Sequence, residues 1–141
     1  TRLQQAVAGI DRSALDAAVE ALMTCYHAGG AVYVIGNGGS AATATHMACD
    51  LSKGPTPPGK QGLVVWSLTD NPALLTALAN DLAYDEVFAQ PILSRMKPCD
   101  VLIADYDFAA GANALLRKWG SGDGLIGDPD ARGSAADQHF H

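Results

Sequence analysis

The segment that most constrains the fold is Gly36-Asn37-Gly38-Gly39-Ser40, which joins a short apolar run to an alanine-rich run. The apolar run, 31–35, is rich in β-branched and aromatic residues and predicts a strand buried on both faces. Ser40 is a favourable N-cap for a helix predicted over 41–51. A strand, a glycine turn and a helix start direct free backbone N–H groups and the positive end of the helix dipole to one point. The segment therefore predicts an anion site, most often for phosphate.

Other interpretations of the glycine segment stay open. The spacing Gly36-x-Gly38-x-x-Ala41 fits a dinucleotide fingerprint, but the nearest suitable acid, Asp70, lies roughly thirty positions on instead of about 20. A hydrolase nucleophile elbow requires Gly-x-Ser-x-Gly, whereas two alanines follow Ser40. A tight turn without a ligand is the structural alternative. Asn37 and Ser40 count against it, because they add side-chain donors beside the glycines.

The rest of the chain alternates between predicted helices and strands. A helix is expected from Ser13, with Asp16 completing a capping box, to the Gly29-Gly30 pair. Further helices are predicted over 72–81, where Asn71 is the cap, and over 84–95, where Pro91 disturbs the pattern. The predicted strands are 63–68 and 101–104, with a weak strand at 125–126. A further helix is expected over 109–119, and a mobile tail over 130–141. This order predicts an α/β fold with a parallel, doubly wound sheet.

Length, charge and cysteine content exclude several classes of protein. A chain of 141 residues predicts one domain, and a net charge of −6 argues against nucleic-acid binding. No apolar run approaches the ~18 residues of a membrane span, and no secretory leader opens this sequence. The three cysteines are odd in number and lack a Cys-x-x-Cys spacing. A reduced, cytoplasmic location is therefore expected.

Two groups of polar residues outside the glycine segment could carry chemistry. His46 and Asp50 stand four apart on the predicted helix, so they share one face. Such a pair can bind a divalent metal or serve as acid and base, or it can simply stabilise the helix surface. Asn80 and Asp81 end a short predicted helix, where they could contact a ligand or only form the turn.

Two blocks of sequence resemble the sugar isomerase (SIS) domain family, and in particular its phosphoheptose isomerase branch. The first is Gly36 to Ala42 with His46-Met47-Ala48-Cys49-Asp50-Leu51, and the second extends from Ser67 through Asn80-Asp81 to Ala89. The resemblance covers roughly 13–104 and then fades, so that 1–141 is expected to be a single SIS domain, divergent or incomplete over 105–141. It implies a three-layer, flavodoxin-like sandwich that is apparently shortened at its C-terminus, and a homo-oligomer, tetramer or dimer.

The resemblance also implies a function and residue roles. The expected activity is aldose–ketose isomerisation of a sugar phosphate, like that of sedoheptulose 7-phosphate isomerase. Asp50 would be the catalytic base and His46 its proton or metal partner. The substrate contacts implied by the matching motifs are Asn37, Gly38, Gly39, Ser40, Asn80 and Asp81. Zinc is the implied metal, bound through His46 and Asp50.

The sequence departs from the family pattern in three places. The zinc-dependent members carry Glu where this chain has the shorter Asp50, and they complete the metal site with a Gln and a His eight apart, a pair not found here. After the third strand, a serine-rich phosphate loop is replaced by Asp105-Tyr106-Asp107-Phe108-Ala109-Ala110. These differences favour a rival hypothesis, a non-catalytic SIS protein that binds a sugar phosphate or a protein partner.

Overall fold

A computed structural model describes residues 1–54, 56–104 and 125–126, and its centre is a parallel four-stranded sheet. The strands lie in the order β2-β1-β3-β4, and each neighbouring pair is parallel. Their bounds are β1 Ala31–Ile35, β2 Val64–Ser67, β3 Val101–Ala104 and β4 Leu125–Ile126. The chain leaves central β1 toward β2 and later returns to the other side of β1 as β3. This reversal of direction confirms the predicted doubly wound topology.

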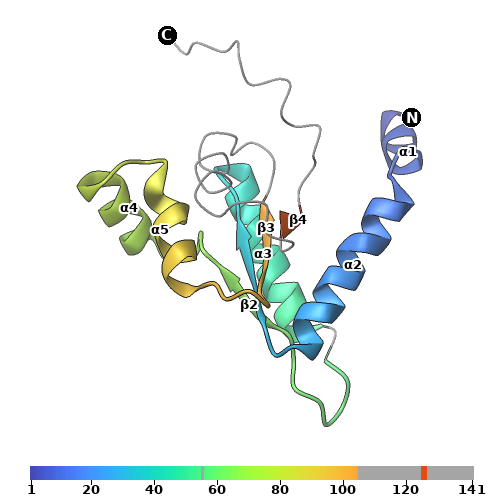
Figure 1. Cartoon of the computed structure of the whole chain (residues 1–141). Helices are drawn as coiled ribbons and strands as arrows, with labels where there is room; N and C mark the ends of the chain where they lie inside the picture. Colours follow the sequence, from blue (N-terminus) through green and yellow to red (C-terminus); the bar gives the residue numbers. More distant parts are fainter. Residues whose placement is uncertain (55, 105–124, 127–141) are drawn as a thin grey trace.

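Helices cover both faces of this sheet, so the predicted three-layer arrangement is confirmed. Figure 1 shows α4 and α5 together on one side of the strands, with α3 and α2 on the other. The helices are α1 Arg2–Ala8, α2 Arg12–His27, α3 Gly39–Lys53, α4 Pro72–Asp81 and α5 Glu86–Arg95. None of the helices in the described ranges is long and apolar enough to cross a lipid bilayer.

Alternate side chains of β1 enter two separate apolar clusters. Tyr33 and Ile35 pack with residues of α5 on one face, whereas Val32 and Val34 pack against α3 and Cys25 of α2 on the other. Each of these four strand residues is at most 6% exposed. An unbroken apolar run is the pattern of a strand buried on both faces, and the structure confirms that prediction.

Asp100 fastens the two central strands where they begin. It is only 5% exposed. Its Oδ1 accepts a hydrogen bond from the Ala31 amide at 2.8 Å, and its Oδ2 accepts one from the Lys97 amide at 2.7 Å. Both carboxylate oxygens are thus paired, which offsets the burial of the charged group. The nearby charge of Asp100 adds to burial, the larger cause, in raising the pKa of the Cys25 thiol.

The start of α2 differs from the prediction. The helix begins at Arg12, and its cap is Asp11, whose Oδ1 accepts from the amides of Ser13 at 2.9 Å and Ala14 at 3.3 Å. Asp11 also accepts a hydrogen bond from the Ser13 hydroxyl, and this contact is the largest cause lowering the pKa of its carboxyl. The predicted capping box on Ser13 is wrong because Asp11 caps the helix two residues earlier, so Ser13 already lies inside the first turn.

The later helix boundaries follow the sequence closely. Asn71 caps α4 by accepting from the Leu74 amide at 3.0 Å, and α4 ends at Asp81 as predicted. Helix α5 continues through Pro91. The weak strand expected at 125–126 is present as β4, parallel to β3. The expectations for 105–110, 109–119 and 130–141 lie outside the described residues.

Candidate functional site

The glycine segment lies at the point where the order of strands reverses. In open parallel sheets, ligands bind beyond the carboxyl ends of the strands at such a switch point, because the connections leave toward opposite faces and open a crevice. Here the chain leaves β1 for α3 on one face, and β3, the neighbour of β1, is reached from α5 on the other. Residues 36–39 follow β1 directly and occupy this edge.

Two glycines of this loop cannot be replaced without strain. A Cβ on buried Gly36 would collide with the Ser40 carbonyl and come within 2.9 Å of the Ala41 nitrogen. Gly38 has φ +54° and ψ −117°, a backbone conformation that L side chains rarely adopt. At Gly39, in contrast, an added Cβ would meet no neighbouring atom of the described chain within 4 Å. Gly36 therefore allows the end of β1 to lie close to the start of α3, and Gly38 allows the sharp turn between them.

The helix start corrects one prediction about this loop. Helix α3 begins at Gly39 with Gly38 as its cap, so Ser40 is the second helical residue and is not the N-cap. The turn at Gly38 allows helical geometry to begin at Gly39, two residues earlier than a Ser40 cap would. No side chain of the described residues caps this helix by a hydrogen bond.

The expectation of free backbone amides is met only in part. The Ser40 amide donates to the Asn37 carbonyl at 2.9 Å, and the Ala41 amide donates to the Gly38 carbonyl at 3.1 Å. Within the described part of the chain, the amides of Asn37, Gly38 and Gly39 have no hydrogen-bond acceptor. All three residues are exposed. The donors available to an anion are therefore those of the loop, which precede the first turn of the helix.

Asn37 and Ser40 place two polar side chains beside these amides. The Oδ1 atom of Asn37 accepts a hydrogen bond from the Tyr84 hydroxyl at 2.7 Å. The half-buried Ser40 hydroxyl has no hydrogen-bond partner among the residues that the structure describes. Ser40 can therefore donate to a ligand without losing a hydrogen bond to any of the described residues.

Asn80 and Asp81 lie at the end of α4 and are exposed. The Nδ2 group of Asn80 donates to the Asp81 carboxylate at 2.9 Å. Tyr84, three residues further on, contacts Asn37, so the segment that follows this pair reaches the glycine loop. No direct hydrogen bond between the pair and the loop is found within the described ranges.

His46 and Asp50 form the predicted pair on α3. The Nε2 atom of His46 lies 3.1 Å from the Asp50 Oδ2, and the other oxygen, Oδ1, lies 3.2 Å from the Lys53 Nζ. The hydrogen bond to Asp50 raises the pKa of Lys53, which stays protonated at neutral pH. The side chains of His46 and Asp50 are 77% and 52% exposed, so a substrate can reach both.

The α3 pair shares a helix face with the glycine loop. Gly39 and His46 are seven residues apart, which is nearly two full turns, so they project in similar directions and lie about 10 Å apart along the axis. That separation suits an elongated ligand with an anionic end. In the described ranges, no hydrogen bond or ion pair links His46 or Asp50 to Asn37, Asn80 or Asp81.

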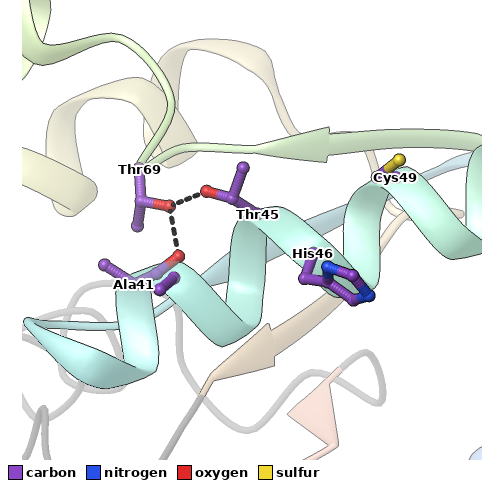
Figure 2. Close-up of a pocket in the computed structure, with 6 residues that line it drawn as sticks. Ala41, Thr45, His46, Cys49 and Thr69 are labelled. Atoms are coloured by element: carbon purple, nitrogen blue, oxygen red, sulfur yellow. Dashed lines mark hydrogen bonds between the residues drawn. The ribbon is translucent and has the colours of Figure 1, made fainter.

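A cluster of three hydroxyls, Thr45, Ser67 and Thr69, was not predicted from the sequence. The Thr69 Oγ1 lies 2.9 Å from that of Thr45 and 2.7 Å from the Ser67 Oγ, and it donates to the Ala41 carbonyl at 3.1 Å. Figure 2 shows Thr69 joined to Thr45 and Ala41, while His46 projects from α3 on the other side. The sequence did contain a signal for this cluster: Ser67 and Thr69 lie at the carboxyl end of the second predicted strand, where ligands bind in such sheets.

An open groove of about 480 Å³ runs along this part of α3. Its lining consists of Ala41, Ala42, Thr45, His46, Cys49 and Thr69. The groove therefore joins Thr45 and Thr69 of the hydroxyl cluster to His46, and it begins in the first turn after the glycine loop.

The described donors do not make a complete zinc site. Catalytic zinc takes three protein ligands and a water or substrate. His46 and Asp50 are two donors, and no group of three or more His, Cys, Asp or Glu residues in the described ranges could hold a metal ion.

Comparison with known proteins gives the following matches. The sequence model described as "SIS domain" matches residues 1–107. The phosphoheptose isomerase of Thiobacillus denitrificans is 40% identical over 87 residues, which are 62% of this chain and 44% of that protein. The phosphoheptose isomerase of Synechocystis is 36% identical over 104 residues, 72% of this chain and 53% of that protein. The chain thus spans about half the length of these relatives.

A solved structure has the same α/β fold as this chain. The phosphoheptose isomerase from Neisseria gonorrhoeae superposes with a TM-score of 0.68, at 22% sequence identity, over 92% of this chain and 82% of that one.

Proposed function

The chain belongs to the SIS domain family, and from this premise we propose that it binds a sugar phosphate and acts as a sedoheptulose 7-phosphate isomerase-like aldose–ketose isomerase. The observation that carries the proposal is the exposed loop at the switch point, whose three consecutive amides have no acceptor in the described structure. The names of the relatives, phosphoheptose isomerases, support the substrate class. We further propose that 1–141 is a single SIS domain.

The phosphate would occupy the mouth of the glycine loop. The amides of Asn37, Gly38 and Gly39 and the hydroxyl of Ser40 supply donors, and the positive end of α3 adds to the local potential. This local group of N–H and O–H donors attracts an anion even though the whole chain carries a net charge of −6. Asn80 and Asp81 would contact the sugar hydroxyls, for which a carboxylate is a suitable acceptor.

The α3 pair would perform the proton transfer. Asp50 would take the proton from the carbon next to the sugar carbonyl, giving an enediolate, and a proton would be returned to the neighbouring carbon. His46, whose Nε2 atom lies 3.1 Å from the Asp50 Oδ2, is placed to relay that proton. Because two donors leave a zinc site incomplete, no step of this mechanism is assigned to a metal.

A specific observation favours a second candidate, a phosphosugar-binding SIS protein without catalysis. Both oxygens of Asp50 are engaged, one by His46 and one by the charged Lys53. A carboxylate held in this way is also what a purely structural surface ion pair would show. Saturable binding of sedoheptulose 7-phosphate with no turnover, with or without added zinc, would decide for this candidate.

We also propose a homo-oligomer, dimer or tetramer, in the cytoplasm. The support for an oligomer is an apolar stripe on α2, where Leu15, Val19 and Met23 are each 48–55% exposed. Isolated apolar faces of this kind are usually covered by a partner helix. The three cysteines are free, as a reducing compartment allows. Sedimentation equilibrium would report a monomer mass if the oligomer is absent, and cell fractionation tests the location.

Ser40→Ala is expected to weaken binding of sedoheptulose 7-phosphate about five- to tenfold, because one donor to the phosphate is lost. The melting temperature should stay the same or rise slightly, since Ser40 is inside the helix and caps nothing. Isothermal titration calorimetry and thermal unfolding measure the two effects. Ser52→Ala, the same change in the last turn of α3, is the control and should bind normally. A lowered melting temperature with unchanged affinity would show that Ser40 has only a structural role.

A further inference from the structure

Tyr84 lies outside the set of residues assigned above, yet it makes the one side-chain hydrogen bond that the described structure records for Asn37. The Tyr84 hydroxyl donates to the Asn37 Oδ1 at 2.7 Å. The two residues are 47 positions apart, and each is exposed at the carboxyl edge of the sheet. We propose that Tyr84 is a positioning residue, which orients the Asn37 side-chain amide as a donor toward the phosphate.

The argument starts from the two-sided chemistry of the asparagine amide. Its oxygen accepts hydrogen bonds and its nitrogen donates them, and a free side chain can turn either group toward a ligand. A phosphate dianion carries only acceptors at neutral pH, so an amide oxygen turned toward it is repelled. Because Tyr84 occupies the Asn37 oxygen, the Nδ2 group remains for the ligand. Asn37 is thereby fixed in the orientation that an anion requires.

The same contact joins the two halves of the proposed sugar site. Tyr84 follows Asp81 by three residues, on the connection between α4 and α5, whereas Asn37 belongs to the loop after β1. The hydrogen bond therefore ties the phosphate end of the site to the segment that carries Asn80 and Asp81. This inference rests on the proposed function, since it assumes that the glycine loop holds the phosphate.

The direct test is Tyr84→Phe, which removes the hydroxyl and keeps the ring. The dissociation constant of sedoheptulose 7-phosphate is expected to rise about five- to tenfold, as for the loss of one hydrogen bond that orders a donor. Tyr26→Phe is a matched control, because the Tyr26 hydroxyl also donates a long-range hydrogen bond, to the Gln61 carbonyl at 2.9 Å. Its affinity should equal that of the unmodified chain.

A double-mutant cycle separates a positioning role from a structural one. In an Asn37→Ala background, Tyr84→Phe should have no further effect on affinity, because the group that Tyr84 orients is gone. An equal loss in both backgrounds, or no loss in Tyr84→Phe alone, would overturn the role of Tyr84 while the proposed function stands. If the unmodified chain fails to bind sedoheptulose 7-phosphate at all, the proposed function is wrong and the role of Tyr84 falls with it.

Discussion

Gly36→Ala is expected to lower the free energy of unfolding by about 3 kcal/mol, a large part of the stability of a domain of this size. The added Cβ would collide with the Ser40 carbonyl and lie 2.9 Å from the Ala41 nitrogen. These are backbone atoms at the start of α3, so the collision cannot be relieved by a side-chain rotation. Either β1 or α3 must shift, and both belong to the apolar cluster that contains Val32, Val34 and Ala44.

Gly39→Ala is the matched control for this change. It introduces the same methyl group three residues away, where φ is not positive and the added Cβ would have no neighbour within 4 Å among the described residues. We expect its free energy of unfolding to change by less than about 1 kcal/mol, in the stabilising direction, because alanine restricts the unfolded chain. Urea unfolding followed by circular dichroism compares the two variants. Equal stability of Gly36→Ala and Gly39→Ala would contradict the close approach of β1 to α3.

Asp50→Asn is expected to reduce kcat/KM for sedoheptulose 7-phosphate by about 10²- to 10⁴-fold, the usual contribution of a positioned general base. The amide oxygen can still accept from Lys53, so α3 should stay intact, and binding of the substrate should change little. The reduction should therefore appear in kcat and leave KM nearly constant. A coupled isomerase assay, with affinity measured separately by calorimetry, distinguishes the two parameters.

Asp16→Asn controls for the change in net charge, because Asp16 is an exposed acid on α2, away from the groove. Its kcat/KM should equal that of the unmodified chain. Retention of activity in Asp50→Asn within about twofold would exclude Asp50 as the base and assign the proton transfer elsewhere. Absence of turnover in the unmodified chain, with binding retained, would identify the non-catalytic candidate instead.

The layered fold could be predicted because its signals are local. The run 31–35 is uninterrupted by polar residues, and buried parallel strands require that pattern. The Asn71-Pro72 pair likewise predicts the start of α4, because cap and first turn are adjacent in sequence. His46 and Asp50 could be paired from their spacing alone, since four residues are one helical turn.

The remaining features depend on contacts between distant segments. Whether Gly38 or Ser40 caps α3 is decided by the positive φ of Gly38, and a glycine can adopt that conformation without being required to. The hydroxyl cluster joins Thr45 to Thr69 across 24 residues, and Tyr84 meets Asn37 across 47. Such pairs become visible only when the sheet has brought the ends of β1 and β2 together.

The most direct test of the account is a titration of the ¹⁵N-labelled chain with sedoheptulose 7-phosphate, followed by the backbone amide resonances. The amides of Asn37, Gly38 and Gly39 should shift together and reach saturation, because each would donate to the phosphate. Sedoheptulose without its phosphate should leave them unchanged at the same concentration. Saturable shifts confined to other parts of the chain, with these three amides unmoved, would contradict a phosphate site at the glycine loop.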